Sequence, residues 1–75
     1  MSKDQLDRQL LAAHALGDLA ELSRLYGAAA DWATSQNDPI AASFYLTHAY
    51  VFALQKGLPS ATEFHQRLKS MGREE

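Results

Sequence analysis

One segment of this chain, from Pro39 to Lys56, constrains the fold more than any other. It reads PIAASFYLTHAYVFALQK, and as a helix it carries apolar side chains on nearly every side. A helix that is hydrophobic all round must be covered on several faces. In a chain of 75 residues such a helix has to be the central element, with the other helices as its cover. The segment therefore predicts an all-α domain.

The length and composition indicate a single domain spanning residues 1–75. A chain this short buries only about 60% of the surface that it exposes when unfolded, so its core must pack efficiently. The absence of cysteine excludes disulfides and thiolate metal ligands. The polar start, MSKDQLDRQ, is not typical of a secretory signal, and no apolar run approaches the roughly 20 residues of a membrane span. We therefore expect a cytoplasmic protein without a membrane partner.

Two short turns divide the chain into two helical hairpins. Gly17 and Gly57 are each placed to end a helix, because glycine reaches the left-handed conformation without steric strain. Such short turns force neighbouring helices to run antiparallel. The first hairpin is expected over about 2–36 and the second over about 38–72, joined at Asn37-Asp38-Pro39.

Each of the four expected helices begins at a recognisable start signal. The four starts are Ser2 with Gln5 three residues on, Asp18 with Glu21, Asp38 followed by Pro39, and Pro59 or Ser60. The second helix is expected to fade at Ser35-Gln36-Asn37 and the fourth to stop at Gly72. The tail from Arg73 to Glu75 is expected to fray.

Apolar residues recur at helical spacing and predict which sides face inward. The expected inward stripes of the other three helices are Leu6, Leu10, Ala13 and Leu16; Leu19, Leu22, Leu25, Tyr26, Ala29 and Ala33; and Ala61, Phe64, Leu68 and Met71. The central helix has an edge of mostly small side chains, which let another backbone approach closely. We predict the tightest helix contact along this seam, which is formed by Ala42, Leu46, Ala49 and Ala53.

The second hairpin has a large aromatic residue, a small residue four positions on, an aromatic residue three further, and a small residue after the turn. These residues are Tyr45, Ala49, Phe52 and Ala61. In this order they resemble the tetratricopeptide repeat, although His48, His65 and Leu68 stand where that family has other residue types. The resemblance implies a tetratricopeptide-like pair of hairpins. A stacked repeat needs about three units, so two units either close as a compact four-helix cluster or leave an apolar face open.

Candidate catalytic and metal-binding residues are scattered along the chain. His14, His48 and His65 come from three expected helices, and none lies four residues from another. A zinc site needs three or four converging ligands. Ser43 and Ser60 lack the strained turn and the glycine-rich oxyanion loop of a nucleophilic serine. We therefore expect no enzyme activity, no metal and no cofactor.

Aromatic residues of the central helix are the best candidates for partner binding. Because Tyr45, Tyr50 and Phe52 point in different directions, at least one should be substantially exposed, and a tyrosine hydroxyl tolerates water best. Tyrosine and tryptophan are also enriched at binding hot spots. We predict a non-catalytic protein-interaction module that binds a partner helix or peptide, or forms a homodimer. The predicted partner-binding residues are Tyr45, Tyr50, Trp32 and Lys56.

The alternative is a small DNA-associated regulator that uses the basic fourth helix. Arg67, Lys69 and Arg73 could touch phosphates beside a short turn, as in a helix-turn-helix. The same cations also suit a helix C-terminus, where they meet the helix dipole, and the net charge of −2 argues against a nucleic-acid partner. Phosphate binding weakens steeply with salt, whereas binding to an apolar groove hardly responds, so salt separates the two functions.

Overall fold

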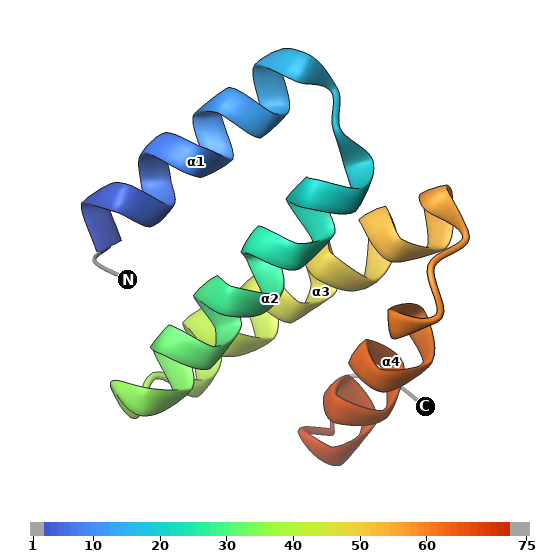
Figure 1. Ribbon diagram of the computed structural model, residues 1–75. Coiled ribbons are helices and arrows are strands. Elements are labelled where there is room, and N and C mark those ends of the chain that lie inside the picture. The colour runs from blue at the N-terminus through green and yellow to red at the C-terminus, as the bar shows by residue number, and fades with distance from the viewer. Residues whose placement is uncertain (1–2, 73–75) are drawn as a thin grey trace.

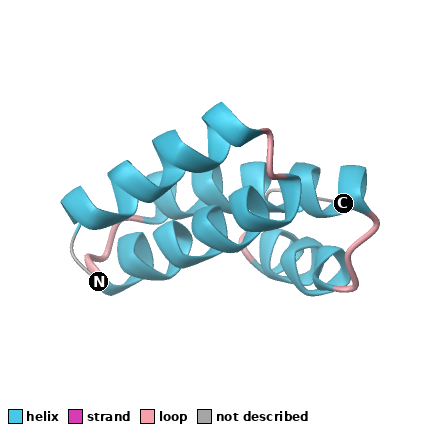
Figure 2. Ribbon diagram, turned by 45° about the horizontal axis from the view of Figure 1, so that its top comes forward, coloured by secondary structure: helices cyan, strands magenta, loops and turns pink. Residues whose placement is uncertain are grey.

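The computed structural model describes residues 3–72, and within this range the chain forms helices and no strand. In chain order the helices are α1 (Lys3–Leu16), α2 (Leu19–Ser35), α3 (Pro39–Lys56) and α4 (Ser60–Ser70). Figure 1 shows α1 antiparallel to α2 and α3 antiparallel to α4, and Figure 2 shows that short loops join them. The predicted all-α fold of two hairpins is confirmed. The predicted cap at Ser2 and the frayed tail over 73–75 lie outside the described residues.

Both inner helices begin where the sequence predicts, because an aspartate caps each of them. The Asp18 carboxylate accepts a hydrogen bond from the backbone N–H of Glu21 at 3.1 Å. The Asp38 carboxylate accepts one from the N–H of Ala41, also at 3.1 Å. Pro39 opens α3 at a position where a missing N–H leaves no hydrogen bond unmade.

The turns after α1 and α3 have the backbone conformation expected of helix-ending glycines. Gly17 has φ of 66° and Gly57 has φ of 72°, both in the left-handed region. The turn after α2 contains Asn37 instead, at φ of 60°, a conformation that asparagine tolerates better than most residues. α4 begins at Ser60 without a side-chain cap, and the first N–H groups of its turn donate to backbone carbonyls, Ala61 to Leu58 and Thr62 to Pro59.

The most extensive helix contact joins α2 to α3. The predicted seam lies at this contact, and its members are each at most 1% exposed: Ala42, Leu46, Ala49 and Ala53. Ser23 of α2 crosses the contact, since its hydroxyl donates a hydrogen bond to the Ala49 carbonyl oxygen at 2.8 Å. The small side chains thus bring the two backbones close together, as predicted.

The buried apolar residues form two clusters, one on each side of α2. The α1–α2 cluster consists of Leu6, Ala13, Leu22, Leu25 and Ala29. The α2–α3–α4 cluster consists of Ala30, Leu46, Ala49, Ala53, Ala61, Phe64 and Leu68. The inward stripe of α4 is confirmed, with Met71 half-buried against the second cluster. Leu16 is 81% exposed, contrary to expectation, because it lies roughly a quarter turn round α1 from Leu6.

The helix with buried residues on two faces is α2 rather than α3. Besides its predicted stripe, α2 buries a second set of small residues, Ser23, Gly27 and Ala30. At Gly27 an added Cβ would lie 3.1 Å from the ring of Phe64, so α4 packs directly on α2. In Figure 1, α1 and α4 lie on opposite flanks of the α2–α3 pair, and the backbone measures 32 × 29 × 14 Å. The expectation that the other helices enclose α3 is therefore wrong, because two flanking helices leave one face of α3 uncovered.

Candidate functional site

The face of α3 that points away from α2 carries large apolar side chains in contact with water. The exposed fractions are 73% for Ile40, 55% for Phe44, 42% for Val51 and 54% for Leu54. At 3.6 residues per turn this face lies about 180° round the helix from Ala49 at the centre of the seam. We define the outer stripe of α3 as the five exposed residues on this face, Ile40, Phe44, Thr47, Val51 and Leu54.

The outer stripe is free of charge. Between Asp38 and Lys56 the chain contains no aspartate, glutamate, lysine or arginine. An exposed helix face normally carries charged side chains. The contrast is α1, which exposes Leu11 and Leu16 but also carries four exposed charged residues, Lys3, Asp4, Asp7 and Arg8. A contiguous apolar face without charge is a candidate site of interaction.

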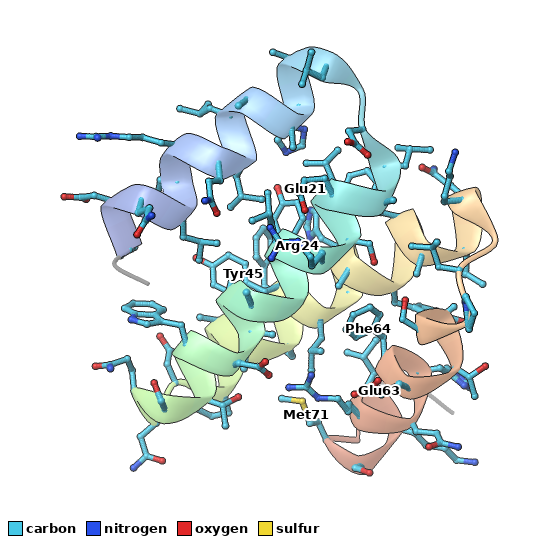
Figure 3. All side chains as sticks on the ribbon, in the orientation of Figure 1. Glu21, Arg24, Tyr45, Glu63, Phe64 and Met71 are labelled. Carbon is cyan, nitrogen blue, oxygen red and sulfur yellow. The ribbon has the colours of Figure 1, made fainter. Side chains whose placement is uncertain are left out.

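Tyr45 and Tyr50 lie on the two flanks of α3 and not on the outer stripe. Both are half-buried: Tyr45 packs against both core clusters and points between α1 and α2 (Figure 3), while Tyr50 stacks on His65 of α4 at 5.4 Å between ring centroids. Phe52 is half-buried against the α1–α2 cluster. The prediction that one of these three is substantially exposed is wrong, because side chains of α1, α2 and α4 cover both flanks.

The remaining predicted partner-binding residues also lie off the stripe. Trp32 is half-buried on α2, which packs on the opposite side of α3. Lys56 is exposed at the last residue of α3, where a cation meets the negative end of the helix dipole.

The sequence contained a signal for the outer stripe, namely a row of large apolar residues opposite the small-residue seam. That signal identifies the stripe once the seam is known.

Aromatic rings connect the outer stripe to the interior. The ring of Phe44 lies 4.5 Å from that of His48, which lies 5.0 Å from the ring of Tyr26 in α2. The His48 Nδ1–H donates a hydrogen bond to the Phe44 carbonyl oxygen at 2.9 Å. Tyr26 Oη and His14 Nε2 of α1 are hydrogen-bonded at 3.0 Å, and burial, followed by the nearby Tyr45, raises the pKa of Tyr26. Phe44 is thus held against packed rings although half of its surface meets water.

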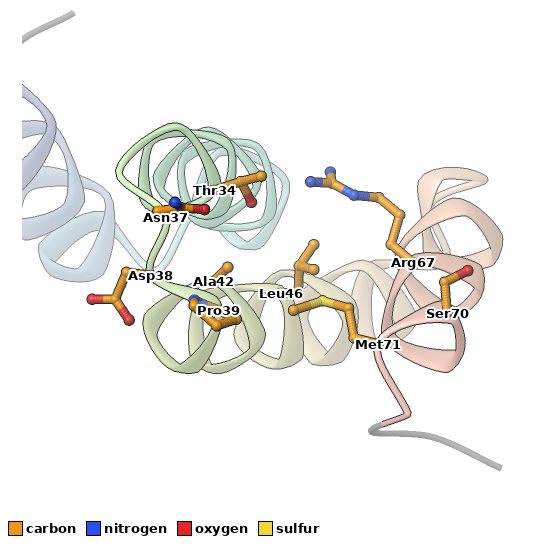
Figure 4. A pocket seen from close by; sticks show the side chains of 9 residues that line it. All are labelled: Thr34, Asn37, Asp38, Pro39, Ala42, Leu46, Arg67, Ser70 and Met71. Atoms are coloured by element: carbon orange, nitrogen blue, oxygen red, sulfur yellow. The ribbon is translucent and has the colours of Figure 1, made fainter.

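Two grooves share Arg67 as a lining residue, one among α2, α3 and α4 and the other between α2 and α4. They measure about 370 Å³ and about 400 Å³. Arg67 donates a hydrogen bond to Asp31 of α2 at 2.7 Å, forming an ion pair. Figure 4 shows Leu46 and Met71 beside Arg67 in the first groove. Because Arg67 is paired within the chain, the basic fourth helix has less free positive charge for phosphate than its sequence suggests.

The histidines are divided between the two flanks of α3. His14 and His48 both contact Tyr26, whereas His65 stacks on Tyr50. Within residues 3–72 no three His, Asp or Glu side chains gather in a group that could hold a metal ion. None of the helices in the described part of the chain is long and apolar enough to pass through a membrane.

Comparison of the chain with protein-family models, with curated proteins and with solved structures found no match.

Proposed function

We propose that this protein is a non-catalytic protein-interaction module and that the outer stripe of α3 is its docking surface. One observation carries the proposal: four large apolar side chains are 42–73% exposed on a face without a charged residue. Complete burial of such a side chain is worth about 1.5–3 kcal/mol relative to leaving it in water. Because the four side chains are 42–73% exposed, a partner that covers the stripe gains the corresponding share of each contribution and leaves no charge unpaired.

The shape of the surface suits a partner helix. The stripe from Ile40 to Leu54 is about 21 Å long at a rise of 1.5 Å per residue. An amphipathic helix laid along it can fit its own apolar side chains between those of the stripe. Phe44 is the central anchor, since the rings behind it fix its position before a partner arrives. Tyr50 and His48, one on each flank, supply the polar rim that surrounds the core of a typical interface.

The substitution Leu54→Glu tests this proposal, with Leu16→Glu as its matched control. Both leucines are more than half exposed, at 54% and 81%, but Leu16 lies on α1. Neither side chain belongs to a core cluster, so both variants should keep the wild-type helical signal and melting temperature. Each variant and the wild type are immobilised separately and exposed to a cell extract to which free wild-type protein has been added. The proteins that each one retains are then compared.

Wild type and Leu16→Glu should retain a protein that Leu54→Glu does not. Loss of a hot-spot side chain removes 2 kcal/mol or more, which is a weakening of at least about 30-fold. Retention by all three proteins, or by none, would contradict the proposed docking surface. Retention that falls steeply with increasing salt concentration would instead favour phosphate binding by α4.

A further inference from the structure

We infer that the partner seated on the outer stripe is a second copy of this chain, with the two α3 helices antiparallel across a two-fold axis. The inference rests on the proposed function, because it takes the outer stripe as a docking surface. It adds the identity of the partner and the register of the two helices. It is carried by the spacing of the stripe, by the fit of its side chains to one another, and by the charges at the ends of α3.

The outer stripe has the spacing of a helix that interlocks with another helix. From Ile40 to Leu54 its members are separated by four, three, four and three residues. This alternation is the heptad seam of a coiled coil, in which each side chain fits between those of the facing helix. The stripe thus matches a helix of the same kind more closely than it matches an extended peptide.

One antiparallel register places four of the five stripe members, Phe44, Thr47, Val51 and Leu54, against a side chain of the second copy. In this register Phe44 faces Leu54 of the second copy and Thr47 faces Val51, while Ile40 lies beyond the second copy's Lys56 and faces no stripe residue, because Leu58 packs against its own core cluster. The two-fold axis repeats each pair, because the same patch is used on both subunits. A register shifted by one heptad step would pair Phe44 with the polar Thr47 and place Leu54 beyond the start of the second copy's α3.

Thr47, the polar member of the stripe, can be buried at an interface without losing a hydrogen bond. Its hydroxyl already donates a hydrogen bond to the Ser43 carbonyl oxygen of the same helix, at 2.8 Å. A buried hydroxyl without a partner would oppose association. Because this hydroxyl is satisfied within α3, its methyl group can contact Val51 of the second copy without leaving an unpaired polar group.

The charges at the ends of α3 favour the antiparallel arrangement over the parallel one. α3 is capped by Asp38 and ends at Lys56. Antiparallel pairing brings the lysine end of one helix toward the aspartate end of the other, and it also opposes the two helix dipoles. Parallel pairing would place like charges and aligned dipoles side by side. Between the two ends, a face without charge requires a partner face without charge, and a second copy provides one.

The size of the stripe fits a reversible dimer. Its four large apolar side chains offer roughly 400 Å² per copy, judged from the area that a fully buried aliphatic side chain removes from water. A standard interface buries about 600–1,000 Å² per partner. The flanking residues Tyr50, His48 and Gln55 supply part of the difference. We therefore expect a monomer–dimer equilibrium with a dissociation constant of roughly 1–100 μM.

Cysteine cross-linking tests the partner and the register together, because the natural chain contains no cysteine. Thr47→Cys and Val51→Cys are prepared separately, one of them with an affinity tag, and are then mixed in a glutathione redox buffer. Since these positions face each other across the axis, the mixed disulfide should exceed both self-linked products. Leu54→Glu, introduced into both variants, should reduce the products to the statistical mixture of random collision. Leu16→Glu in the same background should leave the excess of mixed disulfide intact.

The other outcomes overturn the inference in distinguishable ways. Self-linked products in excess would show parallel pairing. A statistical mixture without Leu54→Glu would show that a second copy does not occupy the stripe. If a different protein were still retained by wild type and lost by Leu54→Glu, this inference would fail while the proposed function stood. If the stripe-dependent retention were absent as well, both would fail.

Discussion

The two faces of α3 differ in the size of their side chains more than in their polarity. The inner face packs on α2 with Ala42, Ala49 and Ala53, while the outer face exposes Phe44 and other large apolar residues. Small side chains let the α2 backbone approach until Ser23 bonds to the Ala49 carbonyl oxygen. Close approach of two helix backbones, and not hydrophobicity alone, therefore decides which face of an apolar helix becomes core. The large residues of the other face stay exposed.

The largest expected effect separates the two faces by one pair of substitutions. Leu46 is 1% exposed and Leu54 is 54% exposed. Leu46→Ala should lower the free energy of unfolding by about 2–5 kcal/mol, because it leaves a cavity at the seam. Leu54→Ala should change it by no more than about 0.5 kcal/mol. Urea unfolding in dilute solution measures both, and equal effects would remove the distinction between the faces.

Overpacking the seam should have the next largest effect. Ala49 is fully buried against α2, so Ala49→Leu has to push the helices apart and should cost about 1–3 kcal/mol. Val51→Leu adds a single methylene on the outer face and should be nearly neutral in the monomer. Thermal unfolding of both variants provides the test. An unchanged midpoint for Ala49→Leu would mean that the seam is misplaced.

The turn after α3 determines where α4 packs. A substitution in this turn should have a smaller effect on stability than those at the seam. Gly57 has φ of 72°, and an added Cβ would meet nothing within 4 Å, so only backbone strain opposes a substitution. Gly57→Ala should therefore destabilise the protein by about 1–2 kcal/mol. Gly17→Ala is the matched control at the other turn, with φ of 66° and equally open space. A stabilised Gly57→Ala variant would indicate that α3 continues beyond Lys56.

The smallest effect concerns Tyr26, which lies behind Phe44 and His48. Its pKa is raised above the ordinary value of 10.0, chiefly by burial. A group with a raised pKa in the folded state contributes stability below its unfolded pKa, and that contribution is lost as the pH rises through the folded value. Stability should therefore fall as the pH rises above about 10. Tyr26→Phe should show a shallower fall in urea unfolding across this range, and an identical fall would show that Tyr26 is not the group responsible.

Local features of the fold could be predicted from the sequence because they depend on neighbouring residues alone. Asp18 and Asp38 cap helices through bonds to backbone groups three residues away, and Gly57 adopts a conformation that its lack of a side chain permits. The seam was also predictable, since small residues recur on one edge of α3. These features require no knowledge of the other helices.

The coverage of each face could not be predicted, because it depends on where distant helices pack. The second buried face of α2 includes Ser23 and Gly27. Because these residues have low hydrophobicity, a helical pattern of apolar residues does not identify them as buried. At least one of Tyr45, Tyr50 and Phe52 was expected to be substantially exposed, but rings and side chains from three other helices cover the flanks of α3. The candidate site lies on the outer stripe and not at the predicted tyrosines for the same reason, since Phe44 and its neighbours lie on the face that no helix covers.

The most direct test of the central claim is the mass of the wild-type protein in solution across a concentration series. Sedimentation equilibrium should show the mass rising from 8.3 kDa toward twice that value as concentration increases. The rise should depend little on salt, because the interface is apolar. Leu54→Glu should remain at the monomer mass throughout. A wild-type mass that stays at 8.3 kDa at every concentration, or a rise that Leu54→Glu shares, would contradict the claim that the outer stripe of α3 is covered by a second copy.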